Sequence, residues 1–330
     1  MTTKWNDLAD HVISGGEITD AEALSILDAP DEELLLLLYA AYQIRKTYYG
    51  NKVKLNMIMN AKSGLCPENC GYCAQSIVSD APIDSYPMVE KKTLLNGAEQ
   101  AHKMNVGTYC IVASGRGPTN RDVDTVVSAV EEIKENYELK ICACLGILKP
   151  DQAARLKAAG VDRYNHNLNT AETNHDNITT SHTYDDRVST VNIAKNAGIS
   201  PCSGVIVGMK ETKQEVVDVA HSLKVLDADS IPVNFLHAID GTPLEGTYEL
   251  DPRYCLKVLA LFRFINPTKE IRISGGREVN LRSLQPLGLY AANSIFVGDY
   301  LTTAGQDSTK DHEMLEDLGF EIDYVKVPVS

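Results

Sequence analysis

Three closely spaced cysteines are the strongest chemical signal in the sequence. Cys66, Cys70 and Cys73 lie within eight residues, on a segment whose Pro67 and Gly71 indicate a loop. Three thiolates placed in this way can bind three corners of one metal cluster. A structural cluster is closed by four protein ligands, so three cysteines leave one corner free for a reacting molecule. A structural zinc site is the alternative, but it favours paired Cys-x2-Cys units and a fourth ligand.

A second group of cysteines falls in predicted strands further along the chain. Cys110, Cys142, Cys144 and Cys202 lie in short apolar runs, and each alone is most simply a small buried residue. Alternate side chains of a strand point to the same side, so inward cysteines from neighbouring strands of a closed sheet can converge on a second cluster. Cys142 and Cys144 share one face, and spacing alone does not choose between them. Cys255 lies in an apolar helical stretch and is expected in the core.

Three asparagines alternate along another predicted strand. Asn165, Asn167 and Asn169 therefore point to one side of it, and buried amides need hydrogen-bonding partners. An amide both donates and accepts, which suits a neutral ligand with N–H and C=O groups, such as a cyclic urea. His166 and His237 are expected to pack or to hydrogen-bond locally.

The elements that position these residues repeat along the chain as a short apolar run, a loop and an amphipathic helical stretch. The runs are rich in Val and Ile and short enough to be buried strands. They span residues 53–59, 108–113, 140–145, 163–168, 201–207, 230–236, 270–274 and 293–297. Eight strand–helix units predict an α/β fold, a (β/α)8 TIM barrel with extra N-terminal helices, and an open doubly wound sheet is the alternative. In a barrel, the site residues must lie at the carboxyl ends of the strands or just after them.

The organisation and charge of the chain set further expectations. We expect residues 1–50 to form a helical extension packed on a single barrel domain over residues 51–330. With 31 Lys and Arg against 45 Asp and Glu, the formal net charge is −14, which disfavours nucleic acid as a partner. The longest apolar run, residues 34–42, is shorter than the roughly 20 residues of a membrane span, and the first residues do not resemble a secretion signal. We therefore expect a cytoplasmic protein that does not enter a membrane and whose cysteines are metal ligands or core residues rather than disulfides.

The spacing Cys-x3-Cys-x2-Cys after the first predicted strand resembles that of the radical S-adenosylmethionine family. The resemblance implies a [4Fe–4S] cluster in which Cys66, Cys70 and Cys73 bind three irons. The fourth iron would bind the amino and carboxylate groups of S-adenosyl-L-methionine. Tyr72 would lie beside the adenine of that cofactor.

Four further motifs resemble those of the biotin synthases in the same order, and the similarity runs from before Cys66 to about Thr303. They are Tyr109-Cys110, Cys142-Ala-Cys-Leu-Gly, Pro201-Cys202-Ser-Gly and Arg272-Ile-Ser-Gly-Gly-Arg277-Glu. This resemblance implies a [2Fe–2S] cluster bound by Cys110, Cys142, Cys202 and Arg277. It leaves Cys144 as a core residue. No general rule nominates Arg277, because a protonated guanidinium has no free lone pair.

The same resemblance implies how the small molecules are held. Contacts to S-adenosyl-L-methionine fall to Tyr72, Asn167, Asn169 and Arg187. Contacts to dethiobiotin fall to Asn165, Asn167 and Asn234 at its ureido ring and to Thr302 and Thr303 at its carboxylate. Arg187 has an alternative role as a solvated helix charge beside two aspartates. Some biotin synthases carry Asp at the position of Asn169, and an amide bonds a ribose hydroxyl more weakly than a carboxylate does.

The activity that these resemblances imply is that of a sulfurtransferase that inserts sulfur into dethiobiotin to give biotin, the last step of biotin biosynthesis. A cofactor must remove hydrogen from a saturated carbon, so the [4Fe–4S] cluster would cleave S-adenosyl-L-methionine and the [2Fe–2S] cluster would donate sulfur. Implied partners are a reductant protein such as flavodoxin or ferredoxin, the iron–sulfur assembly machinery and a second copy in a homodimer. Two alternatives are another radical enzyme that acts on a different small molecule and an electron-transfer or cluster-carrier protein. Lipoyl synthase carries an extra N-terminal cysteine triad, whereas no cysteine precedes Cys66.

Overall fold

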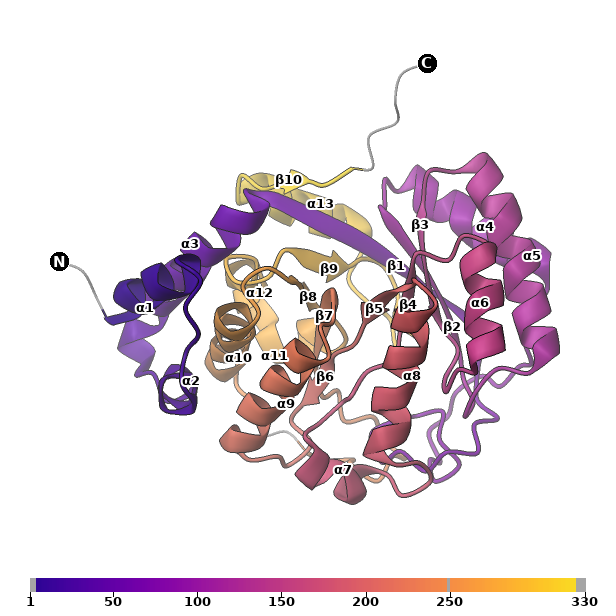
Figure 1. Cartoon of the computed structure of the whole chain (residues 1–330), viewed down its shortest axis with the longest axis horizontal. Helices are drawn as coiled ribbons and strands as arrows, with labels where there is room; N and C mark the ends of the chain where they lie inside the picture. Colours follow the sequence, from indigo (N-terminus) through magenta and orange to yellow (C-terminus); the bar gives the residue numbers. More distant parts are fainter. Residues whose placement is uncertain (1–3, 248–249, 325–330) are drawn as a thin grey trace, which may run out of the picture.

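Parallel strands close into a barrel, which confirms the predicted (β/α)8 architecture (Figure 1). The structure is a computed structural model and describes residues 4–247 and 250–324. The first barrel strand, β1 (Lys52–Lys62), pairs with β2 (Thr108–Ala113) on one side and with β9 (Ser294–Phe296) on the other. Because this pairing joins the two ends of the sheet, the open doubly wound alternative is excluded.

The remaining strands follow in chain order and, except for β10, complete the wall of the barrel. They are β3 (Lys140–Cys144), β4 (Arg163–Asn165), β5 (Ser200–Cys202), β6 (Val205–Val207), β7 (Ser230–Phe235), β8 (Glu270–Ile273) and β10 (Glu321–Ile322). The run predicted at residues 201–207 is divided into β5 and β6, which both pair with β7. At the division, a side chain on Gly204 would come within 2.0 Å of the Pro232 carbonyl oxygen, so only glycine allows this backbone approach. The short strand β10 pairs with the start of β1 and was not predicted.

Helices surround the barrel and connect its strands (Figure 1). They are α1 (Lys4–Ile13), α2 (Asp20–Leu27), η1 (Asp31–Glu33), α3 (Leu34–Tyr49), α4 (Lys91–Lys103), α5 (Asn120–Asn136), α6 (Pro150–Ala158), α7 (Glu172–Ile178), α8 (Tyr184–Asn196), α9 (Lys213–Val225), α10 (Pro252–Ile265), α11 (Arg277–Leu281), η2 (Arg282–Leu284), α12 (Gln285–Gly288) and α13 (Ser308–Asp317). Within the described residues, no helix combines the length and apolar character that crossing a membrane requires.

The N-terminal helices lie on one side of the barrel, where they cover α10 (Figure 1). α10 contacts α2, α3 and α9, and every residue from Cys255 to Ile265 is buried. Arg45 of α3 is also buried, and it donates hydrogen bonds to the backbone oxygens of Ala292 (2.8 Å) and Lys52 (2.9 Å). The extension is thus joined to the start of β1 and to the loop before β9. The division into a helical extension over residues 1–50 and a single barrel domain over residues 51–330 stays a prediction.

Candidate active site

A cavity of about 400 Å³ lies at the carboxyl ends of the barrel strands. Its wall includes the outer triad, which we define as Cys66, Cys70 and Cys73. It also includes two members of the inner triad, which we define as Cys110, Cys142 and Cys202. Other predicted residues in the wall are Tyr72, Asn165, Asn167, Asn169, Arg187, Asn234 and Thr303. This is the end of the barrel at which (β/α)8 enzymes carry their active sites.

The outer triad lies on the loop after β1. Gly64 and Leu65 both adopt positive φ angles, 61° and 54°, and turn the chain back across the barrel mouth. Burial raises the pKa of the Cys66 thiol, and it raises the pKa of Cys73 to about 12. The thiols of Cys66 and Cys73 therefore stay protonated in the absence of metal. The positive charge of a bound metal would favour their deprotonation.

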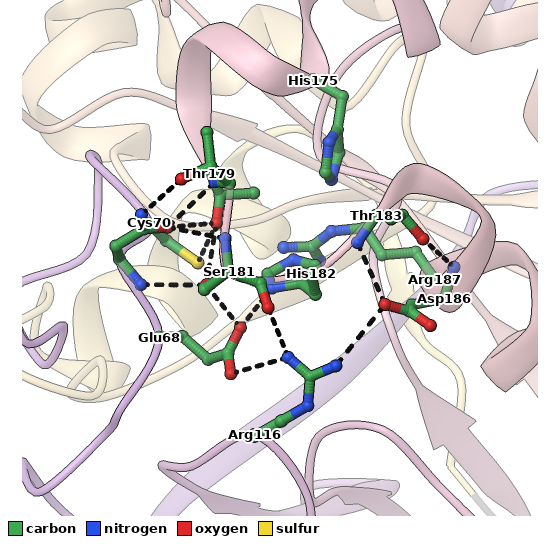
Figure 2. Close-up of polar contacts among 12 residues, drawn as sticks. Glu68, Cys70, Arg116, His175, Thr179, Ser181, His182, Thr183, Asp186 and Arg187 are labelled. Atoms are coloured by element: carbon green, nitrogen blue, oxygen red, sulfur yellow. Dashed lines mark hydrogen bonds and ion pairs between the residues drawn. The ribbon is translucent and has the colours of Figure 1, made fainter.

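Glu68 fastens this loop to the segment between α7 and α8 (Figure 2). Its carboxylate accepts hydrogen bonds from Ser181 Oγ (2.6 Å), from Arg116 Nη1 (3.2 Å) and from His182 Nδ1. The next residue, Asn69, accepts from the backbone N–H of Ser181 at 3.1 Å. Burial favours a raised pKa for Glu68, but these donors outweigh it and lower the pKa.

Arg187 faces the cavity from the first turn of α8. The turn is set by Thr183, whose hydroxyl accepts from the backbone N–H of Asp186 at 3.1 Å. Arg187 is only 5% exposed, and its Nη1 donates to the Asn167 carbonyl oxygen at 2.9 Å. Its Nε is buried without a hydrogen-bonding partner among the described residues. The alternative of a solvated helix charge is therefore excluded.

Asn169 joins Arg187 to Tyr72 on the loop of the outer triad. With the amide oxygen and nitrogen exchanged, the orientation that satisfies both, its side-chain oxygen accepts from the Tyr72 hydroxyl at 2.6 Å and from Arg187 at 3.1 and 3.3 Å. Asn169 has a φ of 71°, a left-handed conformation that asparagine tolerates better than most residues. The amide at this position therefore orients the tyrosine and the arginine.

The inner triad converges inside the barrel. Cys110 on β2 and Cys142 on β3 are partners in the strand register. Hydrogen bonding by Cys110 raises the pKa of the Cys142 thiol, and hydrogen bonding by Cys142 raises the pKa of Cys202. Cys202 also accepts from Asn165 Nδ2 at 3.3 Å. The three thiols, from β2, β3 and β5, thus meet around Cys142.

The prediction that Arg277 completes the inner triad does not fit this geometry. Arg277 begins α11, beyond the end of β8, and is nearly fully buried. Its Nη1 lies 2.7 Å from Asp311 of α13 and its Nη2 lies 3.1 Å from Glu278. It does not line the cavity. The turn at Gly275 and Gly276 directs Arg277 away from the barrel interior. Its side chain instead joins α11 to α13.

Arg272 is the arginine of this motif that lies near the inner triad. It lies on β8, lines the cavity and is close enough to Cys110 and Cys202 to interact with both electrostatically. The signal in the sequence was its place inside the predicted strand at residues 270–274, since only strand residues point into the barrel. The motif contains two arginines, and motif order alone did not distinguish them.

Three further predictions need adjustment. Cys144 was expected in the core, but it is half-buried and lines the cavity. Both ends of the Asn234 amide contact backbone groups, the carbonyl oxygen of Val205 at 2.9 Å and the N–H of Gly275 at 2.9 Å. Thr302 lies in the wall of a neighbouring polar cavity and not of the main one, whereas Thr303 lines both.

Several residues of the cavity wall were not predicted from the sequence. Glu68, Arg116 and His182 lie in loops without a regular period, so no pattern selects them. His166 and His237 were expected only to pack locally, but both line the cavity. Burial lowers the pKa of His166, so its imidazole is neutral at pH 7.

Comparisons with known proteins agree with this architecture. The model of the radical SAM superfamily matches residues 62–223, and that of the biotin and thiamin synthesis associated domain matches residues 232–321. A biotin synthase of Bacillus licheniformis is 78% identical over 98% of this chain and 97% of its own length. A biotin synthase of Bacillus subtilis (strain 168) is 76% identical over 98% of this chain and 96% of its own length.

Solved structures show the same fold at low sequence identity. Methylornithine synthase superposes with a TM-score of 0.84, at 21% identity over 96% of this chain and 97% of that one. An FeFe-hydrogenase maturase from Carboxydothermus hydrogenoformans superposes with a TM-score of 0.81, at 16% identity over 98% of this chain and 80% of that one.

Proposed function

The chain belongs to the biotin synthase family within the radical SAM superfamily, and from that membership we propose that it converts dethiobiotin to biotin by inserting sulfur between two saturated carbons. The observation that carries the proposal is that one cavity at the catalytic end of the barrel is lined by the outer triad and by Cys110 and Cys142, and that Cys142 is hydrogen-bonded to Cys202. A radical enzyme that only methylates or rearranges its substrate would need the outer triad alone.

The residues of the outer site fit a [4Fe–4S] cluster with S-adenosyl-L-methionine. One buried and two half-buried thiols border the cavity, and the unpartnered Nε of Arg187 is available to an anionic group such as the cofactor carboxylate. Tyr72 is held at the cavity wall by Asn169 and offers an aromatic face to the adenine. Asn167 and Asn169 complete the polar wall on this side.

The residues of the inner site fit a [2Fe–2S] cluster. We propose Cys110, Cys142, Cys202 and Arg272 as its ligands, with Arg272 in place of Arg277. The nitrogens Nε and Nη2 of Arg272 donate to protein oxygens, whereas its Nη1 makes no hydrogen bond to a described residue. Nη1 is therefore the nitrogen available to a group held by the three cysteines, and it would bind a metal after losing one proton, because the protonated guanidinium has no free lone pair.

Dethiobiotin would lie between the two triads. Asn165 donates to Asn167 Oδ1 at 3.0 Å, which leaves the Asn167 amide N–H groups, one lone pair of the Asn167 oxygen and the Asn165 oxygen for a ureido ring. Asn234 likewise keeps one amide N–H and one oxygen lone pair for the ring. Thr303 lies in the cavity wall, where the substrate carboxylate would bind.

The chemistry divides between the cofactors and the chain. When both are bound, the outer cluster with S-adenosyl-L-methionine supplies the radical that removes hydrogen, and the inner cluster supplies sulfur. The chain holds the saturated carbon between these two groups and excludes water and oxygen from the barrel. The proposal also requires an electron-donor protein and the assembly machinery that rebuilds the inner cluster, and we propose a homodimer as the working state.

Anaerobic analysis of iron, sulfide and electron paramagnetic resonance tests the two-cluster proposal. We expect the wild-type protein to hold both cluster types and Cys142→Ala to lose only the inner one. Cys255→Ala is the matched control, because Cys255 is a buried cysteine of α10 outside the cavity. With a reductant, the wild type should form biotin and 5′-deoxyadenosine from dethiobiotin. A wild-type protein with a single cluster type would refute sulfur donation from an inner cluster.

A further inference from the structure

Four charged side chains form the floor of the barrel, below the inner triad. Of these four, only Arg272 takes part directly in the proposed chemistry. We define this floor as Lys54, Arg163, Glu270 and Arg272. The Glu270 side chain is only 2% exposed, and it is the one carboxylate among them. Glu270 and Arg272 are two residues apart on β8, so both point into the barrel.

Glu270 contacts all three cations of the floor with its two oxygens. Its Oε2 lies 2.8 Å from Arg163 Nη1 and 3.0 Å from Lys54 Nζ. Its Oε1 lies 2.8 Å from Arg272 Nη2 and accepts from Ser230 Oγ at 3.0 Å. Each oxygen therefore has two partners, which leaves the carboxylate a single well-defined position.

The guanidinium of Arg272 is correspondingly fixed. Its Nη2 donates to Glu270 and to Ser230 Oγ (2.9 Å), and its Nε donates to Ser294 Oγ at 3.2 Å. The plane also lies over the ring of Phe296, with 5.0 Å from Cζ to the ring centroid. These contacts occupy one edge of the guanidinium and leave Nη1 without a hydrogen bond to a described residue, while Arg272 interacts electrostatically with Cys110 and Cys202.

We propose that Glu270 is a positioning residue that holds Arg272 so that Nη1 faces the inner triad. The inference rests on the proposed function, because it assigns Arg272 to the inner cluster. A flexible arginine at this position would donate to any nearby carbonyl group. The anchored arginine instead presents one nitrogen to the three thiols, as outer groups do when they orient a metal ligand.

The floor also carries charge, since three cations meet one carboxylate. This excess of positive charge lies directly below thiols that become anionic when metal binds. Position and charge are therefore separable effects, and two substitutions distinguish them. Glu270→Asp keeps the charge but withdraws the carboxylate by one methylene from Arg272. Lys54→Met removes a cation that contacts Oε2, the carboxylate oxygen that Arg272 does not use, and Arg163 still holds that oxygen in the variant.

The test compares wild type, Glu270→Asp and Lys54→Met after anaerobic reconstitution. We expect Glu270→Asp to change the visible circular dichroism of the inner cluster and to shorten its retention in the presence of a chelator by roughly 10-fold. Lys54→Met should keep the wild-type spectrum. The outer cluster, read by its own resonance signal after reduction, reports in the same sample that the barrel is folded.

Crystal structures of wild type and Glu270→Asp, both without clusters, test the positioning of Arg272 independently of the proposed function. We expect the guanidinium of Arg272 to leave Ser230 and Ser294 in the variant. Unchanged Arg272 geometry and an unchanged inner-cluster spectrum in Glu270→Asp would overturn the positioning role. The same spectral change in Lys54→Met would assign the effect to charge and also overturn it. If the wild type lacks an inner cluster, the proposed function fails and the crystal structures still decide whether Glu270 positions Arg272.

Discussion

Glu68 lies between two cysteines of the outer triad in the sequence, and it is one of the residues through which that loop contacts the loops around it (Figure 2). Its partners Ser181 and His182 immediately precede α8, the helix that presents Arg187. The carboxylate thus sets the distance between the cysteine loop and the arginine that we assign to the S-adenosyl-L-methionine carboxylate. Glu68 therefore holds the cysteine loop and Arg187 together without having to contact the cluster or S-adenosyl-L-methionine.

We predict that Glu68→Gln weakens S-adenosyl-L-methionine binding about 10-fold, because hydrogen bonds to charged groups contribute roughly 1.5–3 kcal/mol and part of this is lost. Equilibrium binding to the reconstituted protein measures the effect, and the resonance spectrum of the cofactor-bound cluster should change shape. The control is Asp185→Asn, because Asp185 is an exposed residue in the first turn of α8. Equal affinities of Glu68→Gln and wild type would contradict this role of the network.

The two arginines of the β8 motif are expected to behave differently. Arg277→Met leaves the buried Asp311 carboxylate without its ion-pair partner, and we expect a loss of about 3–5 kcal/mol in the free energy of unfolding. Arg272→Met should instead remove or alter the inner cluster. Urea unfolding of the cluster-free proteins and circular dichroism of the reconstituted ones measure the two effects. An altered inner-cluster spectrum in folded Arg277→Met would restore Arg277 as a ligand.

At the scale of elements, ion pairs outside the barrel join consecutive strand–helix units. Asp227 follows α9 and lies 2.8 Å from Lys195 Nζ of α8 and 2.6 Å from Lys269 Nζ before β8. Hydrogen bonds from these two lysines lower the pKa of Asp227 to about 2. The side chain is more than half exposed, so the contribution to stability is about 1 kcal/mol or less.

The pH dependence of this contribution has a definite sign. The folded-state pKa of Asp227 is below the unfolded value, so its stabilisation is present above about pH 4 and is lost as the pH falls towards 2. We predict that Asp227→Asn unfolds at lower urea than wild type at pH 7 and that the difference shrinks below pH 4. Glu131→Gln on the exposed side of α5 serves as the control. A difference that stays constant down to pH 2 would argue against the ion pairs as its source.

At the scale of the whole molecule, the N-terminal helices and the barrel share one apolar core. Leu37 and Ile44 of α3 belong to the same cluster of buried side chains as Leu259 of α10. If residues 1–50 were removed, the outer face of α10 would be exposed to water at a cost of roughly 1.5–3 kcal/mol for each large apolar side chain.

We therefore predict that a chain of residues 51–330 is less stable than the full chain and binds a hydrophobic dye. Urea unfolding and dye fluorescence of the two proteins measure this. The milder substitution Leu37→Ala should cost about 2–5 kcal/mol, because it leaves a cavity in the same interface. If the shortened chain unfolded at the same urea concentration as the full chain, residues 1–50 would be a separate unit.

The sequence by itself determined the repeating strand–helix pattern and the spacing of the outer triad, because both depend on residues that are close in the chain. The spacing of apolar residues along the chain indicates which segments are strands. Eight strand–helix units in a row predicted the barrel. Asn165, Asn167 and Asn169 were likewise predicted to share a face, since side chains alternate along a strand. All three line the cavity, although β4 ends at Asn165.

Only the tertiary structure decided which distant residues meet. Arg272 and Arg277 are five residues apart in one motif, yet one points into the barrel and the other pairs with α13. The contacts of Glu68 with Arg116 and His182, and those of Glu270 across the barrel floor, join residues separated by 40 or more positions. Such contacts depend on strand register and loop path, which pair positions that no local period relates.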